Sequence, residues 1–310
     1  MRKPTAQRYS SAACIAYTIA IVFAMAIAMA GCSKPVRRPV QIIPLDLSGP
    51  HPTTQLTINK HPPVTVIFDS GAGSSVLDKS LAQTLGLPDR GSVDIGSPGA
   101  NVRVTGFMTE IASARVGEAD LEGARTVAMD LPDRLKDVSG IVSPYAFAGR
   151  LVRFEFARSR AIVVDKTKAN LPTGASHPYG GERGHLLPAI EVDVVGIKLN
   201  ALLDSGSKYG LQLPLEYAKR VPLRAALVPM EPVQMIGGTH AVFSARVAGT
   251  VHIGSLTLSD PEIQFVEGVP IANVGILVLK SATLVLDPED ERSWLLPASL
   301  PLDPAKGESP

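Results

Sequence analysis

The chain has 310 residues, enough for two domains of ordinary size or for one unit with two lobes. Its formal net charge is +1, so its composition gives no reason to expect nucleic acid as a partner. Aromatic residues make up only 5% of the chain while 27 Gly and 26 Pro are present, which favours an all-β, turn-rich fold over a helical bundle.

Residues 1–31 are typical of a secretion signal, because a basic start precedes the uncharged residues 11–30. Small residues then lead to Cys32, which resembles a bacterial lipoprotein signal whose cysteine becomes the lipidated first residue. An uncleaved transmembrane anchor is the alternative, because the apolar run is long enough to span a bilayer. We expect a lipid on Cys32 that anchors the chain in the cell envelope. In a Gram-negative cell, Ser33 favours the periplasmic face of the outer membrane.

The remaining cysteine, Cys14, lies inside the signal, so we expect a mature chain without a disulfide or a cysteine nucleophile. Residues 32–54 are rich in Pro and basic residues and are expected to form an extended tether. The composition then predicts a first lobe over 55–170, a linker rich in Gly and Pro over 171–186, a second lobe over 187–298, and a disordered tail over 299–310.

The first lobe is expected to begin with two strands, 56–58 and 64–68, joined by a turn at His61-Pro62-Pro63. The second strand ends in Asp69-Ser70-Gly71-Ala72. Residues 78–86 predict a short helix with Asp78 at its N-cap.

The second half repeats this pattern. An apolar segment over 198–203 ends in Asp204-Ser205-Gly206-Ser207, and its aspartate lies 135 residues after Asp69 (204 − 69). Either aspartate alone would be an ordinary turn residue after a strand. Two copies with the same flanks indicate a duplicated half-site.

A second repeat supports the duplication. Gly140-Ile141-Val142 and Gly275-Ile276-Leu277 each begin 71 residues after the aspartate of their half (140 − 69 and 275 − 204). A strand is expected after each, over 151–156 and 282–287. The equal spacing predicts that these segments occupy equivalent places in the two halves.

Together these motifs resemble the aspartic proteases of the pepsin and retropepsin clan, and most closely the fused, single-chain retropepsin-like bacterial proteins. The resemblance covers roughly residues 52–290. It implies a bilobal all-β fold of two β-barrel halves with a few short helices, and flap hairpins at 92–108 and 237–240. The family often has a second Gly after the apolar pair, where this chain has Ser143 and Val278, and neither flap region contains a Tyr.

The resemblance implies that Asp69 and Asp204 are the catalytic pair. Two carboxylates held together cannot both ionise, so they share one proton. The ionised member can take a proton from water while the protonated member donates to a carbonyl oxygen.

Five further residues are expected to support the pair. In the family, the hydroxyl at the second motif position bonds to the other half. From the residues themselves we expect the Gly to allow close approach of the backbone and the next hydroxyl of the second motif to reach the outer oxygen of the aspartate. Here these positions are Ser70, Ser205, Gly71, Gly206 and Ser207.

Other motifs fit less well. The trypsin-like signature requires Gly-Asp-Ser-Gly-Gly, which is absent, and Gly71-Ala72-Gly73 continues to Val76 where a dinucleotide-binding loop has its third Gly. The six His residues lack metal-ligand spacing, so neither a metal nor a cofactor is expected.

We therefore predict an aspartic endopeptidase that acts as a monomer on peptide or protein substrates. The alternative is a catalytically weak or inactive lipoprotein of the same fold that binds peptides or proteins.

Overall fold

The structure is a computed structural model and describes residues 40–96, 103–147, 149–167, 169, 171–180, 186–235 and 238–298. These residues belong to one compact unit. The expected signal peptide, the lipidation site at Cys32, the tail and the flap tips at 97–102 and 236–237 lie outside the described residues.

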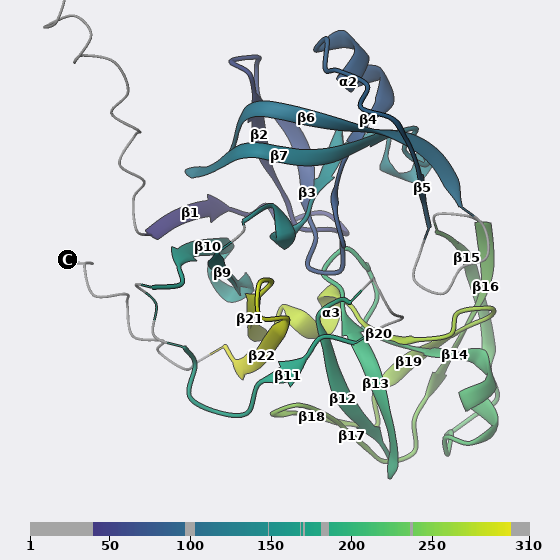
Figure 1. Cartoon of the computed structure of the whole chain (residues 1–310). Coiled ribbons are helices and arrows are strands. Elements are labelled where there is room, and N and C mark those ends of the chain that lie inside the picture. Colours follow the sequence, from purple (N-terminus) through teal and green to yellow (C-terminus); the bar gives the residue numbers. More distant parts are fainter. Residues whose placement is uncertain are drawn as a thin grey trace, which may run out of the picture. The chain divides into compact units, whose positions relative to one another are not determined.

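The first sheet closes into a barrel. Its strand order is β2-β3-β8-β4-β7-β6-β5, and β2 also pairs with β6 (Figure 1). The strands are β2 (Thr53–Ile58), β3 (Val64–Phe68), β4 (Ser75–Asp78), β5 (Ser92–Ile95), β6 (Val104–Val116), β7 (Ala119–Met129) and β8 (Gly140–Val142). This sheet and its connections are called the first lobe below.

The second lobe, built on a nine-stranded sheet, follows the same plan. Its order is β15-β16-β19-β14-β20-β13-β12-β17-β18. The strands are β12 (Ala189–Val194), β13 (Ile197–Leu203), β14 (Leu211–Pro214), β15 (Val228–Met235), β16 (Gly238–Arg246), β17 (Thr250–Ile253), β18 (Leu256–Ser259), β19 (Glu262–Val266) and β20 (Ala272–Val274).

The two lobes differ in how their long strands continue. The antiparallel pair β6–β7 of the first lobe corresponds to two shorter pairs in the second, β16–β19 and β17–β18. The interruption contains Gly249, whose φ is +142°, and Pro261, which has no backbone N–H to donate to a ladder. The fold is thus all-β with two barrel-like halves, as predicted.

A third sheet joins segments from both halves of the chain in the order β1-β10-β9-β21-β22-β11. Its strands are β1 (Val40–Pro44), β9 (Arg150–Glu155), β10 (Arg160–Asp165), β11 (His177–Pro178), β21 (Ala282–Asp287) and β22 (Arg292–Pro297). The expected strands after the two motif loops therefore pair with each other, because β9 and β21 are antiparallel neighbours.

This sheet corrects the predicted tether. Residues 40–44 are not part of an extended tether but form β1, which pairs along its whole length with β10, and β2 begins at Thr53. Ile43 of β1 is fully buried, so burial of an apolar side chain overrides the Pro-rich composition around it. Part of the predicted linker also forms a strand, because β11 pairs with β22.

Helices are short. The helix α2 (Lys79–Thr84) begins after Asp78, whose side chain accepts hydrogen bonds from the backbone N–H groups of Ser80 and Leu81, so the predicted N-cap is confirmed. The other helical segments are α3 (Ile276–Leu279) and the 3-10 turns η1 (Asp133–Leu135), η2 (Pro144–Ala146), η3 (Phe156–Arg158) and η4 (Leu215–Lys219). In the part of the chain that is described, none of the helices has the length and apolar character needed to span a bilayer.

The core connects the third sheet to the first motif. Phe68, the last residue of β3, is fully buried, and its ring centroid lies 4.7 Å from that of Phe154 on β9 and 5.9 Å from that of Phe147. This aromatic packing fixes the strand that ends at Asp69.

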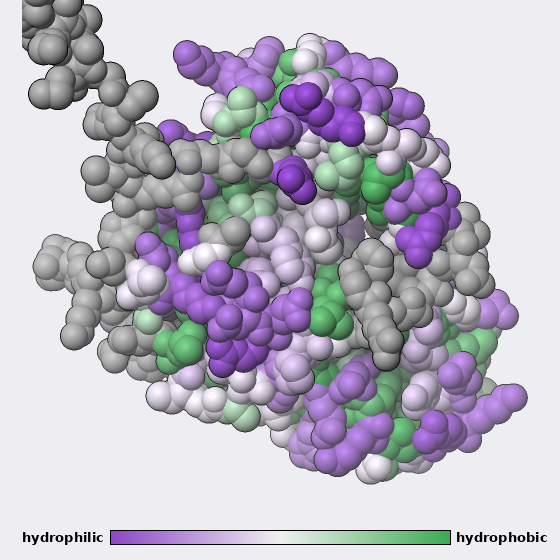
Figure 2. All heavy atoms as spheres, in the orientation of Figure 1, coloured by the Kyte–Doolittle hydropathy of each residue, from purple (hydrophilic) through white to green (hydrophobic). Residues whose placement is uncertain are grey.

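On the face drawn in Figure 2, apolar residues occur as small patches between polar ones.

Candidate active site

Both motif aspartates begin turns that follow equivalent strands. Asp69 follows β3 and its N–H donates to Val142 O (3.0 Å), while Asp204 follows β13 and its N–H donates to Val274 O (2.9 Å). The neighbouring strands β8 and β20 run parallel to β3 and β13. The two halves therefore hold their aspartates in the same way.

This register corrects the second predicted repeat. Phe68 pairs with Val142 and Leu203 pairs with Val274, so the counterpart of Gly140-Ile141-Val142 is Ala272-Asn273-Val274. The match to Gly275-Ile276-Leu277 is wrong by three residues, even though the spacing of 71 residues is equal. The halves differ in the lengths of their connections, so equal separation in sequence does not mark equal positions in space.

The corrected register also explains the missing Gly of the first half. Ser143 and Gly275 occupy equivalent positions after the valines. A Cβ at Gly275 would lie 2.8 Å from Ser207 O, so the backbone approaches too closely for a side chain there. In the first lobe the Ser143 hydroxyl instead donates to Ala72 O (2.6 Å), which satisfies the side chain at that position.

The two serines connect the turns through four hydrogen bonds. Ser70 Oγ donates to Leu203 O (2.8 Å) and accepts from Ser205 N (2.9 Å). Reciprocally, Ser205 Oγ donates to Phe68 O (3.2 Å) and accepts from Ser70 N (2.9 Å). Both serines are buried, so these groups have no access to water as a replacement partner.

The two glycines place each aspartate against the opposite turn. A Cβ on Gly71 would lie 2.8 Å from Asp204 Cγ, and a Cβ on Gly206 would lie 2.8 Å from Asp69 Oδ1. The N–H groups of Gly71 (2.8 Å) and Gly206 (3.0 Å) both donate to Asp69 Oδ1. The carboxylates therefore meet between the lobes, at a place where only glycine fits beside them.

Asp204 has a different set of donors. Its Oδ2 accepts from Asn273 Nδ2 at 2.7 Å. Ser207, which we expected to reach this outer oxygen, instead donates to Gln212 Oε1 at 2.8 Å. The sequence reasoning missed Asn273 because of the three-residue error in register. With the register corrected, the polar Asn273 stands at the position that the apolar Ile141 occupies in the first half, and this difference would have identified Asn273 as a candidate.

The surroundings of Asp69 oppose its ionisation. Burial, followed by the negative charge of Asp204, raises the pKa of Asp69 well above its ordinary value of 3.8. The two glycine N–H groups act in the opposite direction but are outweighed. Asp69 therefore retains a proton at pH values at which an exposed aspartic acid has lost it.

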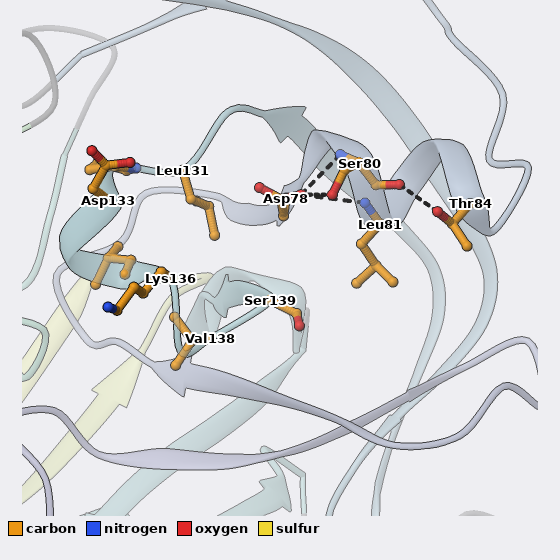
Figure 3. A pocket seen from close by; sticks show the side chains of 11 residues that line it. Asp78, Ser80, Leu81, Thr84, Leu131, Asp133, Lys136, Val138 and Ser139 are labelled. Atoms are coloured by element: carbon orange, nitrogen blue, oxygen red, sulfur yellow. Dashed lines mark hydrogen bonds between the residues drawn. The ribbon is translucent and has the colours of Figure 1, made fainter.

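A separate hollow of about 480 Å³ lies beside α2, and neither Asp69 nor Asp204 is part of its lining (Figure 3). The hollow lies at the C-terminal end of β4, where Asp78 N–H donates to Ser139 O (2.9 Å). The first turn is near the other end of β4, where Ser143 N–H donates to the hydroxyl of Ser75. The lining of the hollow consists of Asp78, Ser80, Leu81, Thr84, Leu131, Pro132, Asp133, Leu135, Lys136, Val138 and Ser139. This hollow contains no residue of the two turns. Within the described ranges, no group of three or more His, Cys, Asp or Glu side chains is placed to hold a metal ion.

Comparison with known proteins gives one family. Residues 54–142 match the aspartyl protease family, a segment that contains Asp69 and ends on β8. The predicted resemblance to aspartic proteases is thereby confirmed. No curated protein sequence matches the chain.

Replacing Ser70 with Ala should destabilise the fold. The change leaves Leu203 O and Ser205 N–H buried without their partner, which should lower the free energy of unfolding by roughly 2 to 4 kcal/mol in urea denaturation. Ser74→Ala, an exposed position in the same loop, is the matched control and should change stability little. Equal stabilities of the two variants would contradict the structural role of the Ser70 hydroxyl.

The raised pKa of Asp69 should make stability depend on pH. Because the folded-state pKa is higher than the unfolded one, the stabilising contribution is complete below about pH 3.8 and is lost as pH rises through the folded-state pKa. Urea unfolding at a series of pH values should show a smaller decline for Asp69→Asn than for the parent chain. The exposed control Asp137→Asn should follow the parent, and an Asp69→Asn curve parallel to the parent would refute the shift.

Proposed function

We propose that the chain is an aspartic endopeptidase that hydrolyses peptide bonds with a water molecule activated between Asp69 and Asp204. The observation that carries this proposal is the meeting of two carboxyls on paired turns from the two lobes, with Gly71 and Gly206 against them. The match of residues 54–142 to the aspartyl protease family supports the reaction class.

The reaction needs one proton on the pair. The ionised carboxylate takes a proton from water as the water oxygen bonds to the peptide carbonyl carbon, and the protonated carboxyl gives its proton to the carbonyl oxygen. The resulting gem-diol collapses when the first carboxyl returns its proton to the peptide nitrogen and the second recovers a proton from a diol hydroxyl. The C–N bond then breaks, and the pair ends in its starting state.

The substrate is an extended peptide segment. The hairpins β5–β6 and β15–β16 occupy corresponding places in the two lobes, as the predicted flaps would. Between such hairpins a peptide is held mainly by its backbone, as an added strand is. Both carboxylates come from one chain, so a monomer completes the pair.

The proposal places this activity in the cell envelope. The sequence alone supports this location, because a basic and apolar leader precedes Cys32. A lipid on Cys32 would hold the protease at a membrane surface, and the substrates would be peptides or proteins of the periplasm in a Gram-negative cell.

Peptide cleavage tests the proposal. The full chain should cut a diverse peptide mixture somewhere between about pH 3 and pH 7, read by mass spectrometry, and Asp69→Asn and Asp204→Asn should each abolish cutting because either change removes the shared-proton pair. The exposed Asp137→Asn is the control for the chemical change and should retain cutting. Cleavage that survives either active-site change would overturn the proposal. Absence of cleavage by the parent would also overturn it, and peptide binding in that case would identify the binding lipoprotein.

A second test uses the glycine contacts. Gly206→Ala should lower kcat by about 100-fold, because the new Cβ would displace the Asp69 carboxyl from its position. Gly73→Ala makes the same change two residues from Gly71, where the new Cβ meets Leu187 Cδ2 at an ordinary 3.5 Å, so its kcat should stay close to that of the parent. Similar kcat values for the two variants would mean that the close approach at Gly206 has no role in turnover.

A further inference from the structure

We propose that Asn273 is a positioning residue that favours ionisation of Asp204, so that Asp204 is the base and Asp69 the acid of the pair. The inference about roles rests on the proposed function. The inference about the order of ionisation rests on the hydrogen bonds to the two carboxyls and does not depend on turnover.

The first support is the hydrogen bond itself. Asn273 Nδ2 lies 2.7 Å from Asp204 Oδ2. A hydrogen bond to a carboxylate is about twice as strong as one to a neutral oxygen. The amide therefore stabilises the ionised form of Asp204 more than the protonated form.

The second support is that the first lobe lacks this donor. Asn273 pairs with Leu202 on β13, and its counterpart Ile141 pairs with Ile67 on β3. Ile141 has no polar side-chain atom, so Asp69 can receive no such bond from the equivalent position. The asymmetry of the pair is built into two matched strand positions.

The third support is Gln212, which neighbours Asn273 on β14. Gln212 Nε2 and Asn273 Oδ1 are both buried atoms without a hydrogen bond, and paired residues of adjacent strands share one face of a sheet. Gln212 Oε1 already accepts from Ser207, so its Nε2 is the atom left to donate. The structure forms no bond between these two atoms, so a small rotation of either amide would be needed before Gln212 could hold Nδ2 of Asn273 towards Asp204. The matched pair in the first lobe is Val76 and Ile141, both apolar.

Within the described residues, Asp69 is a titratable group that lies against Asp204 from the opposite turn. On the turn of Asp204 itself, Lys208 stacks over the Tyr209 ring, and α3 has only apolar residues before Lys280 at its C-cap. Two backbone N–H groups on Asp69 Oδ1 oppose the proposed order, so the proposal requires that the Asn273 amide outweigh them.

This order assigns the proton transfers. Asp204 takes the proton from the attacking water, and Asp69 gives its proton to the peptide carbonyl oxygen. When the C–N bond breaks, Asp204 returns its proton to the nitrogen and Asp69 regains a proton from the diol, so atoms and charges balance.

The test exchanges the two matched residues in the full chain. The variants are Asn273→Ile, Ile141→Asn and the double exchange. Aspartate side chains are labelled with carbon-13, and the carboxyl signals are titrated by NMR after assignment with Asp69→Asn and Asp204→Asn. In the parent, the lower apparent pKa of the pair should be reported mainly at Asp204.

Asn273→Ile should raise that lower apparent pKa by about one pH unit, because a hydrogen bond to a charged group is lost. The double exchange should restore a low value, now reported at Asp69. Ile141→Asn alone should lower the upper apparent pKa. This arm keeps the test decisive if circular dichroism shows that Asn273→Ile does not fold.

An unchanged lower pKa in folded Asn273→Ile would overturn the proposal, because a space-filling role would not move it. So would a parent in which Asp69 ionises first, or an unchanged upper pKa in Ile141→Asn. In an active enzyme, the acidic limb of kcat/KM should shift upward with Asn273→Ile. The titration needs no turnover, so a chain that cleaves no peptide would overturn the proposed function while the order of ionisation is still decided.

Discussion

The four reciprocal hydrogen bonds between Ser70 and Ser205 are the constraint on which the site depends. They join two turns that lie 135 residues apart in the sequence, and each serine bonds to the carbonyl of the residue that precedes the opposite aspartate. Because every group in this set is buried, losing one hydroxyl leaves two partners unsatisfied. The carboxylates are held facing each other by the same bonds that hold the lobes together at this point.

The third sheet supports this arrangement by joining strands that follow each of the two lobes. β9, which follows the first lobe, pairs with β21, which follows the second, so one continuous ladder carries backbone from both halves. Phe154 on β9 packs on Phe68, one residue before Asp69. Strain or slippage in this sheet would therefore reach the first turn directly, since close-packed interiors transmit displacement.

Symmetry in the backbone coexists with asymmetry in the side chains. The serines and glycines are the same in both turns, whereas Asp69 accepts two backbone N–H groups and Asp204 accepts the Asn273 amide. A pair in perfectly equal surroundings would have no preferred place for its one proton. Acid and base roles separate when the environments of two titratable groups differ, and the proposed separation rests on the residues at 141 and 273.

The sequence by itself determined the local features of this protein. Pattern and turn chemistry predicted the apolar strand that ends in Asp-Ser-Gly and the N-cap at Asp78, because each depends on residues close together in the chain. The duplication could be recognised because each copy of the motif is itself a short stretch. Only the tertiary structure decided the features that depend on distant partners. The register of β20 against β13 brought Asn273 to Asp204, and the ladder with β10 turned part of an expected tether into β1. Pairing between strands far apart is set by loop lengths and by burial on both partners, which no short stretch of sequence contains.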